Sequence, residues 1–161
     1  MARPIEVELK FEGLFLEKSL PLLKEKYNCQ GIYTVYTGIY FEKENRSELR
    51  KLLYIGETKN LSERMHEHIK NQDWKEYFKD NEVFIFAVAK LDETLTEEDR
   101  QQIEAALIYH HCKLPCNDKH TKSFGKPLTR ILTSGYNDFL EKDFSAHGDW
   151  SFTPLDPLAP Q

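Results

Sequence analysis

The chain has 161 residues, of which 40% are hydrophobic and 30% are charged, and its formal net charge is −5. That length supports one domain with a proper core and is short for two independent ones. No apolar run approaches the roughly 18 residues of a membrane-spanning helix, and the opening stretch lacks the pattern of a secretion signal. We therefore expect a soluble, cytoplasmic protein with no membrane contact and, because the three cysteines are an odd number, free thiols.

The first thirty residues mix leucines with balanced charges. Their pattern predicts an extended segment at residues 5–11 and, because Pro21 interrupts the pattern, only a short helix at residues 22–26. We expect this N-terminal extension to pack on the edge or back of the domain.

A β-hairpin is predicted next. Residues 32–41 alternate apolar and polar side chains, residues 51–57 form a second strand-like run, and the polar segment 42–48 between them is typical of a turn. The first strand opens with Gly-Ile-Tyr at residues 31–33, and the second carries Tyr-Ile-Gly at residues 54–56. Residues near these motifs should therefore sit on a rigid platform.

A helix should come after the hairpin. Asn60 is a good N-cap, and apolar side chains then recur every four residues as a buried stripe, namely Leu61, Met65 and Ile69. Arg64 and His68 are also four residues apart, so they share an adjoining face and can meet one phosphate together. The alternative is a solvated helix face that carries only weak surface ion pairs.

Residues 83–91 read as a central strand buried on both faces. Thr96 then begins a helix with three acidic residues in its first turn, and this helix ends before Pro115. Glu104 lies inside this helix, and Asn117 comes shortly after Pro115. Taken alone, a helical glutamate is usually surface decoration and an asparagine here suits a simple turn.

Together these residues resemble the GIY-YIG nucleases, small metal-dependent enzymes that cut phosphodiester bonds. The resemblance covers residues 31–118. It rests on the two motifs, on the run at residues 57–61 and on the order and spacing of four later residues, namely Arg64, His68, Glu104 and Asn117.

The resemblance also implies roles. Glu104 would be the hard oxygen ligand for one divalent ion, Mg²⁺ or Mn²⁺. Arg64 would supply a fixed positive charge, Asn117 would help to orient the site, and Tyr33 would be the base or the group that positions the attacking water. Two further side chains would complete the hydrogen-bonded network: Tyr54 and His68.

Two features complicate the transfer of these roles. A second Gly-Ile-Tyr occupies residues 38–40, and Tyr40 is an odd seven residues from Tyr33, so the two tyrosines should point to opposite faces of the strand. We favour Tyr33 and keep Tyr40 as the alternative.

The position after the second motif is Glu57, where relatives such as the excision-repair incision subunit often have lysine, which puts substrate preference in doubt.

Six basic residues are candidates for contacts with nucleic acid. Between residues 113 and 130 there are five basic residues against one acid on an otherwise acidic chain, although such lysines can also merely solvate a loop. The candidates are Lys59, Lys113, Lys119, Lys122, Lys126 and Arg130.

A structural zinc site is a weaker hypothesis. His110, His111, Cys112 and Cys116 are close in sequence, but they lack a second ligand pair at ordinary zinc-site spacing. We do not expect zinc.

We therefore predict an α/β (α+β) fold with a small, mainly antiparallel three-stranded central sheet flanked by helices. Residues 31–123 would form the nuclease-like core, residues 1–30 an N-terminal extension, and residues 124–161 a C-terminal extension with a poorly ordered, proline-rich tail. The predicted function is a metal-dependent endonuclease, most readily on DNA, in restriction, phage or genome defence. A silent binding module for nucleic acid or protein and an RNA-cleaving enzyme are the alternatives, and a homodimer or protein partner is compatible with the sequence.

Overall fold

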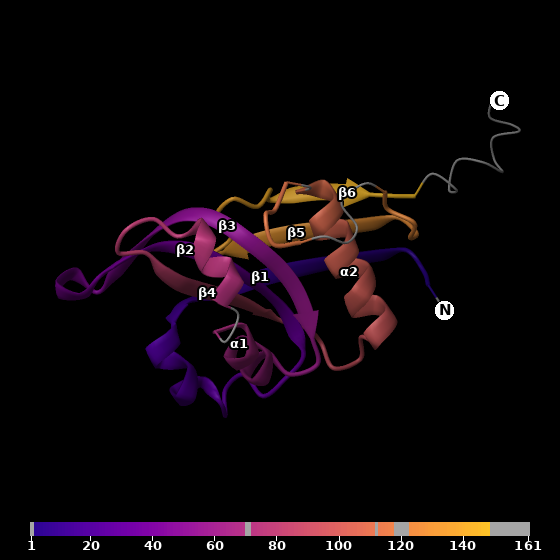
Figure 1. Ribbon diagram of the computed structural model, residues 1–161. Helices are drawn as coiled ribbons and strands as arrows, with labels where there is room; N and C mark the ends of the chain where they lie inside the picture. Colours follow the sequence, from indigo (N-terminus) through magenta and orange to yellow (C-terminus); the bar gives the residue numbers. More distant parts are fainter. Residues whose placement is uncertain (1, 70–71, 112, 118–122, 149–161) are drawn as a thin grey trace, which may run out of the picture.

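The computed structural model describes residues 2–69, 72–111, 113–117 and 123–148. Within them the backbone forms one six-stranded, curled sheet in the order β3-β2-β4-β1-β5-β6 (Figure 1). The strands are β1 (Ile5–Leu16), β2 (Gly31–Phe41), β3 (Arg46–Thr58), β4 (Val83–Lys90), β5 (Thr129–Gly135) and β6 (Asp143–Ala146).

The expectation of a three-stranded, mainly antiparallel sheet is wrong. The sheet has six strands and is mixed, because β1 runs parallel to β5 through residues 5–11 and antiparallel to β4 through residues 12–16. Three of the strands come from segments outside the motif-bearing region, and the pairing of β1 with β5 joins residues more than a hundred positions apart, which local alternation does not reveal. The class remains α+β.

The strand β2 is the centre of the motif-bearing half. It pairs antiparallel with β3 on one side and with β4 on the other, so that Tyr33 lies opposite both Gly56 and Val88. The register of the hairpin shifts twice, between Val35 and Tyr36 and again between Thr37 and Gly38. The first motif and the second are therefore direct neighbours across the sheet.

The two α-helices cover different faces of this sheet (Figure 1). The helix α2 (Glu97–His110) packs Ile103 and Leu107 against one apolar core, whereas α1 (Leu61–Ile69) packs Leu61 and Met65 against the other. Because the sheet lies between them, the end of β3 is the place where residues of both helices can reach the hairpin.

Both predicted helix starts are confirmed. Asn60 accepts a hydrogen bond from the backbone N–H of Glu63 at 3.1 Å. Thr96 and Asp99 form a reciprocal capping box, in which each side chain accepts from the other's backbone N–H. The N-terminal helix expected at residues 22–26 is instead a 3₁₀ helix, η1 (Glu17–Leu23), with Pro21 inside it.

The described residues also form two short 3₁₀ helices, η2 (Glu42–Glu44) in the hairpin turn and η3 (Gln72–Tyr77) before β4. After η2, Asn45 adopts the left-handed conformation with φ 49°, and β3 begins directly afterwards. Among the described helices none is long and apolar enough to cross a membrane.

The end of α2 is fastened to the C-terminal segment by His111. Its Nδ1 lies 2.9 Å from the carbonyl of Leu107, and its Nε2 accepts the backbone N–H of Glu141 at 3.0 Å. These two contacts together require the neutral ring with the proton on Nδ1. Burial lowers the pKa of His111 below its ordinary value of 6.5.

This contact predicts a pH dependence of stability. A depressed pKa in the folded state means that the stabilisation is complete above about pH 6.5 and is lost as the pH falls through the folded-state pKa. We expect the free energy of unfolding, measured with urea, to fall between pH 7.5 and 5.5 by more in the wild type than in His111→Gln. Equal losses in the two proteins would contradict this assignment.

Candidate active site

The site begins with Tyr33 near the start of β2, which lies beside Tyr54 of β3 and Arg64 of α1. Tyr33 is only 1% exposed, and its hydroxyl oxygen accepts a hydrogen bond from Arg64 Nε at 3.2 Å. The rings of Tyr33 and Tyr54 stack with centroids 5.9 Å apart. Arg64 also pairs with Glu67 at 2.7 Å, and about a third of its side chain stays exposed. The arginine is thus fixed by Tyr33 and still open to a ligand.

Burial raises the pKa of Tyr33 above its ordinary value of 10, the neighbouring Tyr54 raises it further, and Arg64 opposes both effects. The pKa of Tyr54 is also raised, mainly by burial and next by the charge of Glu104. At neutral pH both phenols are therefore protonated. Glu104 lies close enough to Tyr54 to influence its ionisation.

Gly56 makes the approach of Tyr33 possible. A Cβ atom at residue 56 would lie less than 3.0 Å from both the hydroxyl oxygen and a ring carbon of Tyr33. Since Tyr33 is buried, its ring has no free space into which it could retreat. A glycine in this motif is therefore required by close packing.

We expect Gly56→Ala to destabilise the protein by about 1–3 kcal/mol, the usual cost of overpacking, and to displace Tyr33 from Arg64. Urea denaturation measures the first effect. Gly125→Ala is the matched control, because a Cβ atom there meets nothing within 4 Å. A Gly56→Ala variant as stable as Gly125→Ala would show that Tyr33 is not packed against Gly56.

Glu104 and Asn117 close the outer edge of β3. The carboxylate of Glu104 accepts the backbone N–H of Glu57 at 2.8 Å. The side-chain amide of Asn117 accepts from the N–H of Ile55 at 2.9 Å and donates to the carbonyl of the same residue at 3.0 Å, so it replaces a missing neighbouring strand. The backbone N–H of Cys116 adds a bond to the carbonyl of Leu53 at 3.0 Å. These contacts fix β3 beside α2.

Glu57 does not point its charge into open solvent. Its carboxylate is paired with Arg100 Nε at 2.8 Å, and the two side chains are only 16% and 10% exposed. Arg100 also donates to the side-chain oxygen of Gln30 at 2.7 Å. Sequence reasoning missed both Arg100 and Gln30. Arg100 lies one helical turn before Glu104, but that spacing alone does not distinguish it from a surface arginine.

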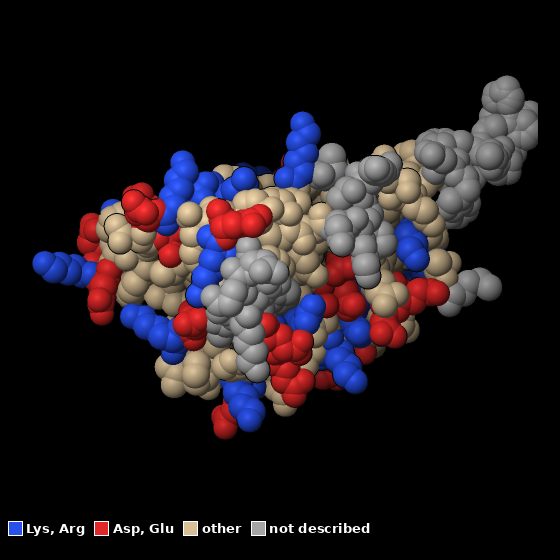
Figure 2. All heavy atoms as spheres, in the orientation of Figure 1, with Lys and Arg blue, Asp and Glu red and all other residues tan. Residues whose placement is uncertain are grey.

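Not all of the predicted residues can be placed. His68 belongs to α1, but its side chain lies outside the described part of the structure, as do Lys119 and Lys122. Lys59 and Lys113 are exposed, and Lys126 is half-buried. The guanidinium of Arg130 is paired with Asp143 at 2.7 Å and with Glu6 at 3.4 Å, so its charge is already balanced. On the face shown in Figure 2, acidic and basic side chains are interspersed.

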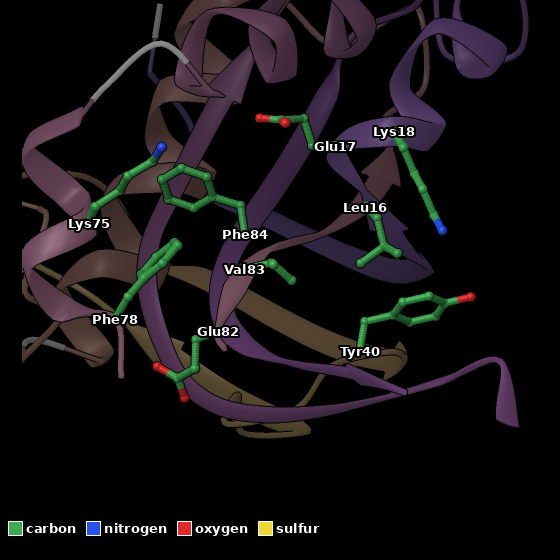
Figure 3. Close-up of a pocket in the computed structure, with 9 residues that line it drawn as sticks. All are labelled: Leu16, Glu17, Lys18, Tyr40, Lys75, Phe78, Glu82, Val83 and Phe84. Atoms are coloured by element: carbon green, nitrogen blue, oxygen red, sulfur yellow. The ribbon is translucent and has the colours of Figure 1, made fainter. Parts of the chain in front are cut away.

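Tyr40 lies at the other end of the hairpin from the site. Its hydroxyl donates to Asn45 at 2.9 Å, and its ring lines a pocket of about 460 Å³ near the start of β4 (Figure 3). None of the predicted catalytic residues lines this pocket, whose walls are Leu16, Glu17, Lys18, Tyr40, Lys75, Phe78, Glu82, Val83 and Phe84. Of the two candidate tyrosines, Tyr33 is the one that contacts Arg64 and Tyr54.

The carboxylate of Glu104 fits a hard divalent ion. Cys112, one of the four residues of the zinc hypothesis, lies outside the described residues. Within the described residues, no three His, Cys, Asp or Glu side chains gather to form a protein-only cage. Mg²⁺ is commonly held by only one or two carboxylates, with water and substrate phosphate completing its shell, and Glu104 can supply one. The two described cysteines are free, and burial raises the pKa of Cys116 to about 11, so its thiol is protonated at neutral pH.

A buried tyrosine, a half-buried tyrosine, an arginine and a helix carboxylate thus lie around the β2–β3 hairpin. The family model described as the GIY-YIG catalytic domain matches residues 36–117, which is half of the chain. The chain therefore belongs to the GIY-YIG family. No curated protein and no solved structure matches it. The matched range includes Tyr54, Arg64, Glu104 and Asn117, and it begins after Tyr33.

Proposed function

We propose that this protein is a metal-dependent endonuclease that hydrolyses phosphodiester bonds in DNA. The observation that carries the proposal is the meeting of five predicted residues at the end of β3. Tyr33, Tyr54 and Arg64 contact one another or pack together, and Glu104 and Asn117 bind the backbone of the same strand. A fixed positive charge, a carboxylate and a hydroxyl are the groups that phosphodiester hydrolysis needs.

Each residue would act through what it already contacts. Arg64 is oriented by Tyr33 and would place a permanent positive charge against the non-bridging oxygens of the phosphate. Tyr33 would be the base that accepts a proton from the attacking water; since it holds its own proton at neutral pH, it would act through its deprotonated form, whose fraction grows as the pH rises. Asn117 would keep the motif backbone in register while the substrate binds.

Glu104 would hold one Mg²⁺ or Mn²⁺ ion, which when bound neutralises charge on the phosphate and assists the leaving oxygen. The contact with the Glu57 backbone would fix the direction of the carboxylate. Lys59 comes directly after β3, and both it and Lys113 are exposed, so they are the first candidates for contacts with flanking phosphates. We also propose that residues 31–123 form the catalytic core. The biological context that we propose is restriction, phage biology or genome defence.

The test is cleavage of circular and linear duplex DNA, single-stranded DNA and RNA, each with Mg²⁺, Mn²⁺ or EDTA. We expect duplex DNA to be cut with either metal ion and left intact with EDTA. Cleavage of RNA alone would change the substrate class. If the protein cuts none of them but binds one in a salt-sensitive way, the binding-module alternative replaces the nuclease.

A further inference from the structure

Arg100 is a buried cation at the centre of the contacts that join three elements. It lies in α2, and the exposed fraction of the whole residue is 8%. Its Nε donates to the carboxylate of Glu57 at the end of β3 at 2.8 Å, and another of its nitrogens donates to Gln30, directly before β2, at 2.7 Å. The elements that Arg100 joins are the ones that carry Tyr33, Tyr54 and Glu104.

Two residues of α2 form hydrogen bonds with Glu57. Arg100 holds its carboxylate, and Glu104, four residues further along the same helix, accepts its backbone N–H. Residues four apart lie one above the other on a helix, so the two contacts hold Glu57 together. We call Arg100, Glu57 and Glu104 with these contacts the clamp. A shift of Glu57 would therefore move the hydrogen-bond partner that orients Glu104.

Gln30 extends the clamp to the loop before α2. Its side-chain N–H groups donate to the carbonyls of Asp92 at 2.6 Å and Leu95 at 3.0 Å, while its oxygen accepts from Arg100. Its own carbonyl accepts the N–H of Leu91 at 3.1 Å. Arg100 is thus supported from the strand and from the loop, and has little freedom to release Glu57.

Charge gives the clamp a second consequence. Glu57 and Glu104 are two carboxylate-bearing residues in direct contact at a half-buried edge, and an uncompensated Glu57 would repel the substrate phosphate. The guanidinium of Arg100 supplies the opposite charge to Glu57 and so offsets that carboxylate within the protein.

We propose that Arg100 is a positioning residue, which through Glu57 orients Glu104 and thereby sets the affinity of the site for its divalent ion. This inference rests on the proposed function, since it assumes that Glu104 holds the ion. It also accounts for a glutamate at residue 57: the charge that departs from the family pattern is offset within the protein.

The experiment measures Mn²⁺ affinity from the relaxation enhancement of water protons, with and without a DNA duplex, together with kcat, KM and the melting temperature. Loss of a group that orients a metal ligand usually costs about 10–100-fold in metal affinity or activity, and we expect a loss of that size in Arg100→Gln. The double variant Glu57→Gln with Arg100→Gln should lose no more Mn²⁺ affinity than Arg100→Gln alone, because both substitutions break the same contact. Arg100→Lys, which keeps the charge, serves if Arg100→Gln does not fold.

Arg50→Gln is the matched control. It removes an equally well-bonded arginine, which pairs with the buried carboxylate of Glu82 and donates to the carbonyl of Tyr77, so it should lower the melting temperature without changing Mn²⁺ affinity. The proposal is overturned if Arg100→Gln loses no more Mn²⁺ affinity than Arg50→Gln, or if the wild type binds no Mn²⁺. Arg100-dependent Mn²⁺ binding without any cleavage would instead retain the clamp and reject the nuclease.

Discussion

We expect Glu104→Gln to lose metal-dependent cleavage by at least about 10²–10³-fold, the usual cost of removing one group that stabilises the charge of a transition state. The amide keeps an oxygen that can accept the N–H of Glu57, so the edge of β3 stays closed. The substitution removes the negative charge that a hard cation needs. Cleavage of duplex DNA under single-turnover conditions measures the loss, and Mn²⁺ titration shows whether the ion still binds.

Glu97→Gln is the control for this substitution. It makes the same chemical change on the same helix, at an exposed residue in the first turn of α2, so cleavage should match that of the wild type. The melting temperature of Glu104→Gln should also stay close to that of the wild type. If Glu104→Gln cuts DNA at the wild-type rate, the carboxylate does not hold the metal ion.

The local elements around the motifs were predictable because their signals are local. Asn60 and Thr96 indicate helix starts through short polar side chains, and alternation over residues 32–41 identifies a strand. The site residues could be grouped only through the family resemblance. No spacing in the sequence indicates that the carboxylate of Glu104 accepts the backbone N–H of Glu57, which is 47 residues away.

The extent of the sheet was not predictable in this way. The strand β1 joins two halves of the sheet because its first part pairs with β5 and its second part with β4, and both partnerships are long-range. Likewise, Arg100 looks like an ordinary surface arginine in an acidic first turn, and only its burial against Glu57 and Gln30 shows otherwise. In both cases the missing information is tertiary pairing.

The choice between the two Gly-Ile-Tyr tyrosines leads to the second large effect. We expect Tyr33→Phe to lower the rate of cleavage by about 10²–10⁴-fold, the range typical of a lost proton-transfer group. The substitution removes the hydroxyl that Arg64 contacts and keeps the ring that packs on Tyr54 and Gly56. Because burial raises the pKa of Tyr33 above 10, catalysis through its deprotonated form predicts a wild-type rate that rises with pH between 7 and 9. The residual rate of Tyr33→Phe should not rise.

Tyr40→Phe is the natural comparison, since it makes the same change in the second Gly-Ile-Tyr. It removes only the exposed hydrogen bond to Asn45 in the hairpin, so cleavage should remain at the wild-type level. The family match begins between the two tyrosines, at residue 36, and so includes Tyr40 and excludes Tyr33. If Tyr40→Phe is inactive and Tyr33→Phe is active, the family match has identified the correct tyrosine and the contacts of Tyr33 are structural. The opposite result assigns the first motif to Tyr33, with a hairpin longer than the family pattern.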